Sequence, residues 1–174
     1  LNNLKKNSIQ AWFWPADLTK QEETEEMVKE FISKFGVING IITNAGGDIA
    51  GRGKNAEGGK AENNSFFIDK LEHENIFDRN YYTCFNTLKA VTPYMKKQGF
   101  GKVVTVSSVN AAFGVEKETA YSVAKAGVLQ LTRSLAKELR KDGINVNCIM
   151  PGPVKTGRFM STLKGRNKHD LEKI

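Results

Sequence analysis

We expect an α/β fold, a doubly wound parallel sheet with helices on both faces. Short apolar stretches alternate along the chain with longer segments in which apolar residues recur at helical spacing. No short hairpin turn joins one apolar stretch to the next, so consecutive strands are predicted to be connected through helices. Polar or turn-forming residues follow the apolar stretches, at the carboxyl edge of the sheet where such folds bind ligands.

The composition is typical of one globular domain and argues against several other classes. Of the 174 residues, 40% are hydrophobic and 26% are charged. No apolar run reaches the roughly 18 residues of a membrane span, so we expect no membrane partner. The net charge of +7 is spread beside glutamates rather than gathered into a basic stripe, so nucleic acid is the least favoured partner. Two separated cysteines, Cys84 and Cys148, indicate thiols in a reducing, cytoplasmic location; no Cys/His cluster has metal-ligand spacing.

The N-terminal part is predicted to hold a strand, a helix and a second strand. Residues 8–15 (SIQAWFWP) are rich in apolar and aromatic residues and predict a strand. Thr19 and Glu22 have the spacing of a capping box, so a helix is expected to begin there and to end at Gly36. Residues 37–43 (VINGIIT) then predict a short buried strand.

The remainder begins with a glycine-rich polar segment, residues 46–64, which predicts a surface loop. The elements predicted after it are a helix over 71–98 that ends at Gly99, a strand over 102–107, a helix over 119–142 that stops at Gly143, a strand over 144–150, and a basic, weakly helical tail from residue 156.

Tyr121 and Lys125 are the first candidates for catalysis. They are four residues apart in a predicted helix, so they share one helix face. A nearby ammonium favours the charged form of a phenol, which suits Tyr121 to exchange a proton with a substrate oxygen. Ser108, at the end of the preceding strand, could hydrogen-bond the same oxygen, and Ser107 is the alternative.

Several motifs, in this order, resemble the short-chain dehydrogenase/reductase family: Asn44-Ala45-Gly46 after a strand, Ser108, Tyr121-Ser-Val-Ala-Lys125, and Asn147-Cys-Ile-Met-Pro151-Gly152. Their order and spacing match over nearly all of residues 17–156. The resemblance implies a Rossmann-like dinucleotide-binding catalytic domain, present here as a single partial domain over residues 1–174. It also implies hydride transfer between NAD or NADP and a secondary alcohol or ketone.

The resemblance implies roles for matching residues. Tyr121 would be the general acid/base, Lys125 would lower its pKa and bind the nicotinamide ribose, and Ser108 would orient the substrate carbonyl. Asn80 matches the asparagine that holds a proton-relay water, although a polar residue at a helix kink is the alternative interpretation. Besides Tyr121 and Lys125, the expected cofactor contacts are Asp17, Leu18, Asn44, Ala45 and Gly46 on the adenosine side, and Pro151, Gly152, Val154 and Thr156 on the nicotinamide side.

The family's glycine-rich phosphate loop is absent from this sequence, as are the first two strands that accompany it. The chain also begins at Leu1, so we expect it to be part of a longer polypeptide; an inactive fragment is the alternative. Taken alone, it is predicted to have a gap in the sheet between strands 8–15 and 37–43. The choice between NAD and NADP depends on residues that this chain lacks.

Substrate recognition is expected from residues after Ser108 (Asn110, Phe113 and Val115) and from the segment 157–168. The long helices over 71–98 and 119–142 are expected to pair between subunits in a homodimer or homotetramer, as the resemblance implies. A non-catalytic binding module with the same fold is the alternative to an enzyme.

Overall fold

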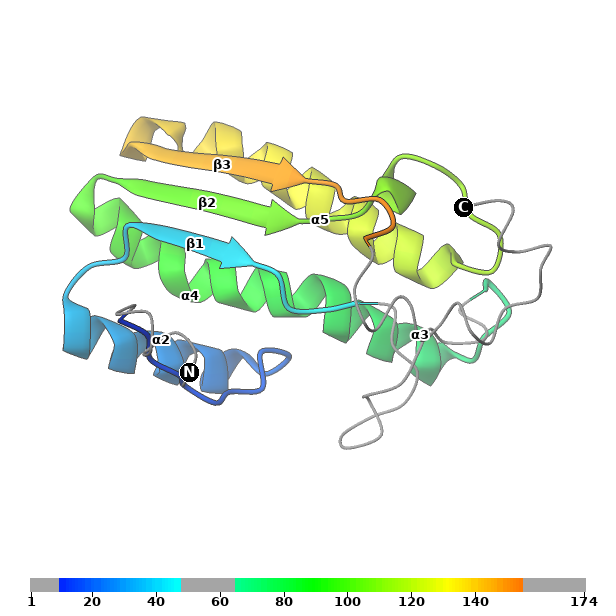
Figure 1. Cartoon of the computed structure of the whole chain (residues 1–174), viewed down its shortest axis with the longest axis horizontal. Helices are drawn as coiled ribbons and strands as arrows, with labels where there is room; N and C mark the ends of the chain where they lie inside the picture. Colours follow the sequence, from blue (N-terminus) through cyan, green and yellow to red (C-terminus); the bar gives the residue numbers. More distant parts are fainter. Residues whose placement is uncertain (1–9, 48–64, 155–174) are drawn as a thin grey trace.

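A three-stranded parallel sheet lies over a layer of helices in this computed structural model, which describes residues 10–47 and 65–154 (Figure 1). The strands are β1 (Gly40–Thr43), β2 (Gly101–Val106) and β3 (Ile144–Ile149), in the order β1-β2-β3. The register sets Ile41 opposite Val103 and Val103 opposite Val146. The predicted α/β fold with a parallel sheet is confirmed.

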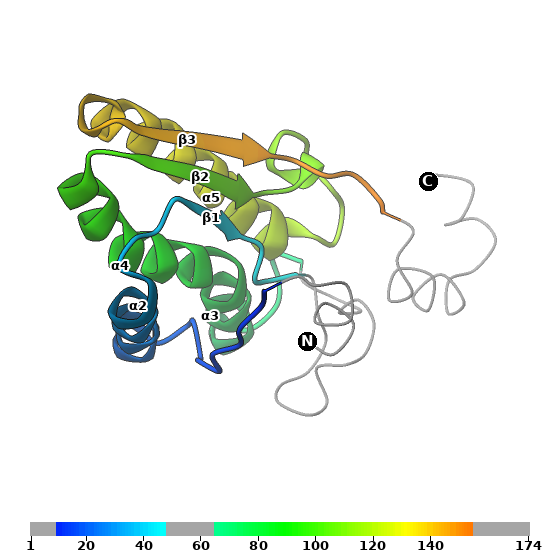
Figure 2. The same cartoon turned by 60° about the vertical axis from the view of Figure 1, so that its left-hand side comes forward.

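The helical layer consists of α2 (Gln21–Phe35), α3 (Lys70–Phe77), η2 (Asp78–Tyr82), α4 (Thr83–Gln98) and α5 (Thr119–Glu138), with the short turns η3 (Val109–Ala111) and η4 (Arg140–Asp142). The helices α4 and α5 cross behind the strands, and α2 lies against α4, so the described helices cover one face of the sheet (Figure 2). The run α3-η2-α4 is the long helix predicted over 71–98, with a π-helical turn in its middle.

The core lies between the sheet and these two long helices. Met95 of α4 and Val128 of α5 are fully buried, and Val103 of the central strand is 1% exposed. Burying each such side chain contributes about 1.5–3 kcal/mol. Along β2 and β3 buried residues alternate with more exposed ones, because successive side chains point to opposite faces of a sheet.

The strand predicted over residues 8–15 is not observed in its described part. Residues 10–16 form no strand, and Trp12 and Trp14 pack on α2 instead. The Trp12 ring centroid lies 4.8 Å from that of Phe35, and the Trp14 centroid lies 5.7 Å from that of Phe31. A strand needs a hydrogen-bonded neighbour, and no described strand borders this segment, so the two tryptophan rings contact a helix instead, with Trp12 still 45% exposed.

The predicted gap between two strands therefore becomes a free sheet edge at β1, which pairs only with β2 among the described residues. A pocket of about 370 Å³ lies beside β1. Its lining includes Trp14, Leu18, Met27, Ile41, Ile42 and Cys84.

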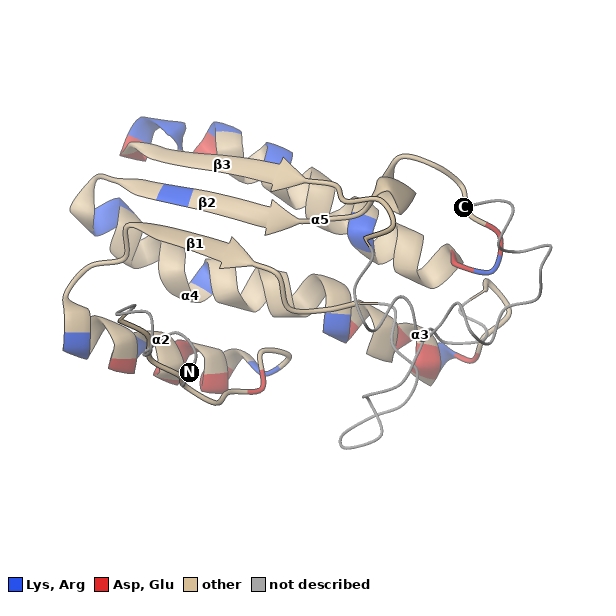
Figure 3. Ribbon diagram, viewed as in Figure 1, with Lys and Arg blue, Asp and Glu red and all other residues tan. Residues whose placement is uncertain are grey.

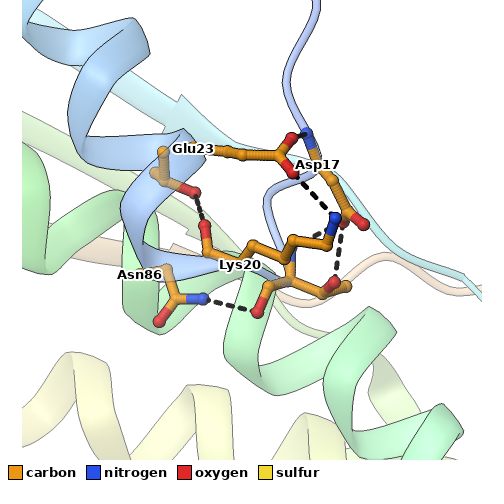
Figure 4. A network of polar contacts seen from close by, with 6 residues as sticks. Asp17, Lys20, Glu23 and Asn86 are labelled. Carbon is orange, nitrogen blue, oxygen red and sulfur yellow. Dashed lines mark hydrogen bonds and ion pairs between the residues drawn. The ribbon is translucent and has the colours of Figure 1, made fainter.

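The helix predicted to begin at a Thr19–Glu22 capping box begins instead at Gln21, and the box does not form. Thr19 donates both its backbone N–H (3.0 Å) and its hydroxyl (2.7 Å) to Asp17 Oδ1. The carboxylate of Glu23, one residue later than predicted, accepts the backbone N–H of Asp17 at 3.0 Å (Figure 4). Asp17 thus takes the backbone N–H of Thr19 that the Glu22 side chain would accept in a capping box. The predicted end at Gly36 is confirmed.

The loop predicted over 46–64 and the tail from 156 lie largely outside the described residues. Within the described ranges, no helix is both long and apolar enough to span a membrane. Residues 10–47 and 65–154 also contain no group of three or more His, Cys, Asp or Glu side chains that could hold a metal ion. Their lysines and arginines lie on several helices and on β2 rather than along one stripe (Figure 3).

Candidate active site

Three strand ends meet at the carboxyl edge of the sheet, as the sequence predicts. Asn44 follows β1, Ser107 follows β2, and Pro151 follows β3. The last two exits are tied together, because Ser107 N–H donates to the Ile149 carbonyl at 2.9 Å and Val109 N–H donates to the Pro151 carbonyl at 3.2 Å. Parallel strands thus present their turns to one side, where a ligand can reach the backbone.

Lys125 is a buried cation on α5, with 5% of its surface exposed. Its ammonium donates a 3.0 Å hydrogen bond to the Val106 carbonyl at the end of β2. Burial lowers the pKa of Lys125 below its ordinary value of 10.5, and the nearby Cys84 and Cys148 partly oppose this shift. A buried ammonium with one carbonyl partner retains unused donors for a further group.

Tyr121 lies one turn before Lys125 on α5, and its side chain is half-buried. The Lys125 Nζ is 5.9 Å from the centroid of the Tyr121 ring. The same helix packs against η3, the turn that Ser108 caps, so the three predicted catalytic residues come from two elements in contact.

The two adjacent serines differ in what their hydroxyls do. Ser107 is buried and its hydroxyl donates to the Lys125 carbonyl oxygen at 2.7 Å. Ser108 Oγ accepts the Asn110 N–H at 3.3 Å, and no hydrogen bond donated by this hydroxyl is found among the described residues. Of the two serines, Ser108 is therefore the one whose hydroxyl has a donor available for a ligand.

Asn80 lies in the π-helical turn and is 1% exposed. Its Oδ1 accepts the Gly47 N–H at 2.8 Å, and its Nδ2 donates to the carbonyl oxygens of Ile76 (3.0 Å) and Gly47 (3.2 Å). The Asn80 side chain thus links the segment after β1 to the helix. Such a structural link fits the alternative interpretation of Asn80, a polar residue at a helix kink. Single π-helical turns inside α-helices often occur at functional sites.

Gly46 fits closely under the same turn. Its φ is +130°, and a Cβ there would lie 2.9 Å from the Arg79 carbonyl oxygen and 3.0 Å from Asn80 Oδ1. Only glycine meets both requirements without strain. The preceding residue is held too, because the Thr83 hydroxyl donates to the Ala45 carbonyl at 3.3 Å. Asn44 and Ala45 are exposed at the edge of the sheet.

Asp17 and Leu18, the predicted adenine contacts, lie in the turn before α2. Hydrogen bonds from Thr19 lower the pKa of the Asp17 carboxyl, which is exposed. Asn86 of α4 donates from Nδ2 to the carbonyl oxygens of Leu18 (3.0 Å) and Thr19 (3.1 Å). Sequence reasoning did not single out Asn86; the available signal was a polar residue between apolar positions of a predicted core helix.

The nicotinamide-side residues Pro151, Gly152 and Val154 follow β3 at the same edge and are half-buried or exposed, whereas Thr156 lies outside the described residues. Of the predicted substrate residues, Phe113 is 69% exposed. Asn110 hydrogen-bonds the Glu118 carboxylate across the loop between η3 and α5. The segment 157–168 also lies outside the described residues.

This geometry defines the class of the protein: an α/β protein with polar residues at the carboxyl edge of a parallel sheet. The sequence matches the short chain dehydrogenase family over residues 1–167, and the chain belongs to that family. It is 30% identical over 152 residues to 3-oxoacyl-(acyl-carrier-protein) reductase FabG of Staphylococcus epidermidis, covering 87% of this chain and 57% of that protein.

Solved structures show the same fold. The structure of NAD⁺-bound xylitol dehydrogenase matches with a TM-score of 0.79 and 24% identity, over 94% of this chain and 58% of that one. The structure of ElxO with NADP bound matches with a TM-score of 0.80 and 22% identity, over 95% of this chain and 62% of that one. The chain thus spans less than two thirds of the length of these relatives.

Proposed function

We propose that this chain supplies the catalytic part of an NAD- or NADP-dependent oxidoreductase that acts on a secondary alcohol or ketone. One observation carries the proposal: the buried Lys125 ammonium lies 5.9 Å from the Tyr121 ring, on the helix that packs against the Ser108 turn. Family membership supports the proposal. So do the two similar solved structures, one with NAD⁺ bound and the other with NADP bound.

The residues present fit the two ends of a dinucleotide. On the adenosine side, Asn44 and Ala45 are exposed at the strand end, and Gly46 brings the backbone close to the helix. On the nicotinamide side, the exposed Gly152 follows β3. The sequence has no glycine-rich loop for the pyrophosphate. The Asp17 turn would bound the adenine, as the family resemblance implies.

The proposed reaction is hydride transfer, and the nicotinamide supplies or accepts the hydride when bound. In the direction of reduction, the Tyr121 phenol donates a proton to the carbonyl oxygen of the substrate. The Ser108 hydroxyl donates a hydrogen bond to the same oxygen and stabilises the charge that develops there. The Lys125 ammonium favours the phenolate that remains, and Asn80 is proposed to hold the water that returns the proton.

A Tyr121→Phe variant of the full-length protein tests this proposal. It removes the proton donor alone, so turnover with NADH or NADPH should fall by roughly 10²-fold or more while the dissociation constant of the cofactor stays unchanged. Tyr94→Phe is the matched control, because Tyr94 is a partly buried helix tyrosine that packs on the core. Retained turnover in Tyr121→Phe would refute the mechanism.

A non-catalytic binding module with the same fold is the second candidate. It would be supported if the full-length protein bound neither nicotinamide nucleotide.

We also propose a cytoplasmic homodimer or homotetramer. Tyr82 beside α4 and Val123 of α5 are 43% and 50% exposed, which supports an apolar contact there. Gel filtration that gives only monomer would contradict the assembly.

A further inference from the structure

Asn86 makes a buried link between two distant parts of the chain. The residue is 5% exposed on α4, and its side chain reaches the turn that holds Asp17 (Figure 4). Its Nδ2 donates to the carbonyl oxygens of Leu18 at 3.0 Å and Thr19 at 3.1 Å. Both N–H groups of the amide are therefore used on a turn that lies 67 and 68 positions earlier in the sequence. The short asparagine side chain offers two donors on a single nitrogen.

The other bonds of this turn are exposed and lie within the turn and the start of α2. Thr19 donates to Asp17, Glu23 accepts the Asp17 N–H, and Lys20 pairs with Glu23 at 2.8 Å (Figure 4). Solvent-exposed pairs of this kind contribute little to stability. They set the conformation of the turn but do not fix its place against the strand ends. Asn86 fixes the position of the turn, because it belongs to the core helix α4.

The helical run that contains Asn86 also binds the segment after β1, on the other side of the proposed adenosine site. Asn80 bonds both backbone groups of Gly47, and Thr83 bonds the Ala45 carbonyl. Asn80, Thr83 and Asn86 follow one another at intervals of three, so they lie along one side of η2 and α4. One rigid element therefore sets the distance between the Asp17–Thr19 turn and the segment after β1.

We infer that Asn86 is a positioning residue for the adenosine half of the cofactor site, which it serves by holding the Asp17–Thr19 turn. The inference rests on the proposed function. Asn86 directs both of its donors to this turn and not to the helix that carries Tyr121, so its effect should fall on cofactor binding and not on the chemical step. Displacing a binding segment by about 1 Å is enough to weaken a preorganised site.

The decisive variants are Asn86→Ala and Asn86→Gln in the full-length protein. Asn86→Ala removes both donors, so KM for the dinucleotide should rise about tenfold, the effect of one to two hydrogen bonds. The value of kcat at saturating cofactor should stay within about twofold of the unaltered protein. Asn86→Gln keeps two donors on a longer side chain and should recover part of the affinity.

Thr87→Val is the matched control. Thr87 is as buried as Asn86 and neighbours it, but its hydroxyl donates to the Thr83 carbonyl within α4. This variant should lower the melting temperature and leave the cofactor KM unchanged, which separates a positioning effect from general loss of stability. If Asn86→Ala fails to fold, Asn86→Ser keeps one shorter donor at the same position, and a rise of about threefold in KM is then expected.

Two further measurements distinguish the inference from the proposed function. Inhibition by AMP should weaken in Asn86→Ala as much as dinucleotide binding does, whereas inhibition by nicotinamide mononucleotide should not change. Amide hydrogen exchange over residues 17–21 should accelerate, while exchange in β2 should not. Faster exchange with an unchanged cofactor KM, or a fall in kcat alone, would overturn the inference and spare the proposed function. Failure of the unaltered protein to bind either nucleotide would overturn both.

Discussion

The Ser107 hydroxyl donates a 2.7 Å hydrogen bond to the main-chain carbonyl oxygen of Lys125. This bond fastens the end of β2 to the middle of α5, and the Lys125 ammonium makes a second link by donating to the Val106 carbonyl. The helix that carries Tyr121 is thus locked in register with the strand that delivers Ser108. The two serine hydroxyls thus differ: that of Ser107 links the strand to the helix, whereas that of Ser108 donates no hydrogen bond to a described residue.

Ser107→Ala should therefore mainly lower the stability of the protein, whereas Ser108→Ala should mainly lower kcat. Ser107→Ala leaves the Lys125 carbonyl without its buried donor, so the free energy of unfolding should fall by about 1–3 kcal/mol. Ser108→Ala should cost less stability but lower kcat by roughly 10²-fold, because a donor to the substrate oxygen is lost. Urea unfolding and steady-state kinetics on both variants measure the contrast. Equal loss of stability in both would contradict it.

Lys125 should make the stability of the protein depend on pH. Burial lowers its pKa in the folded state below the value of 10.5 expected for the unfolded chain. Between these two values the unfolded state binds more protons, so the free energy of unfolding rises with pH in that window. The native protein should thus gain stability relative to Lys125→Met as pH approaches 10.5 from below. Urea unfolding of both proteins at about pH 8 and about pH 10 measures this, and parallel curves would contradict it.

Gly46→Ala tests the close approach beneath the π-helical turn. The new Cβ would meet the Arg79 carbonyl oxygen at 2.9 Å with a backbone φ of +130°, so a loss of about 1–3 kcal/mol in stability is expected. Gly114→Ala is the control, since a Cβ at that position would have no described neighbour within 4 Å. Thermal or urea unfolding of both variants measures the difference. A Gly46→Ala variant as stable as Gly114→Ala would show that the turn can shift without cost.

The elements that could be predicted from the sequence are those whose signal is local. The helix expected over 119–142 is observed as Thr119–Glu138 followed by the turn Arg140–Asp142, because its apolar stripe and the closing Gly143 are contiguous in the chain. The motif residues at the strand ends lie at the predicted edge because the strands pair in parallel, as the alternation of strands and helices along the chain predicts.

Features that depend on a distant partner could not be predicted. The aromatic segment around Trp12 has strand composition, yet in the described structure its rings pack on α2, because strand formation requires a neighbouring strand. For Asn86 the only signal was a polar residue between apolar positions of a predicted helix, since its two acceptors lie 67 and 68 positions away. The offset of the helix start likewise depends on which of two nearby carboxylates, Asp17 or Glu22, accepts the Thr19 backbone N–H.

The two thiols should differ in reactivity. Cys84 is 3% exposed and burial raises its pKa, although a contact with the Thr43 hydroxyl at 3.2 Å partly opposes the shift. Cys148 is partly exposed, and both cysteines are free. A thiol reagent should therefore modify Cys148 in the native protein and reach Cys84 at least about tenfold more slowly, because the thiolate is the reactive form. Mass spectrometry of the labelled peptides distinguishes them; faster labelling of Cys84 would contradict its burial.

The free edge of β1 predicts self-association of the 174-residue chain. Within the described residues β1 pairs only with β2, and Ile42 in this edge strand is 67% exposed. Unpaired edge strands with apolar side chains recruit further strands, and a lysine in the edge opposes this by requiring burial of a charge. Ile42→Lys should reduce light scattering at high protein concentration several-fold, with a change in stability within about 0.5 kcal/mol.

Val37→Lys is the control that distinguishes an effect on strand pairing at the β1 edge from an effect of the added charge. Val37 is also exposed, at 50%, but it precedes the strand, so its substitution adds the same charge without touching the β1 edge. If the edge is what associates, Val37→Lys should scatter light like the unaltered chain. Equal protection by both variants would mean that net charge, and not strand pairing, governs association. A strand added beside β1 would remove the same liability by pairing its backbone.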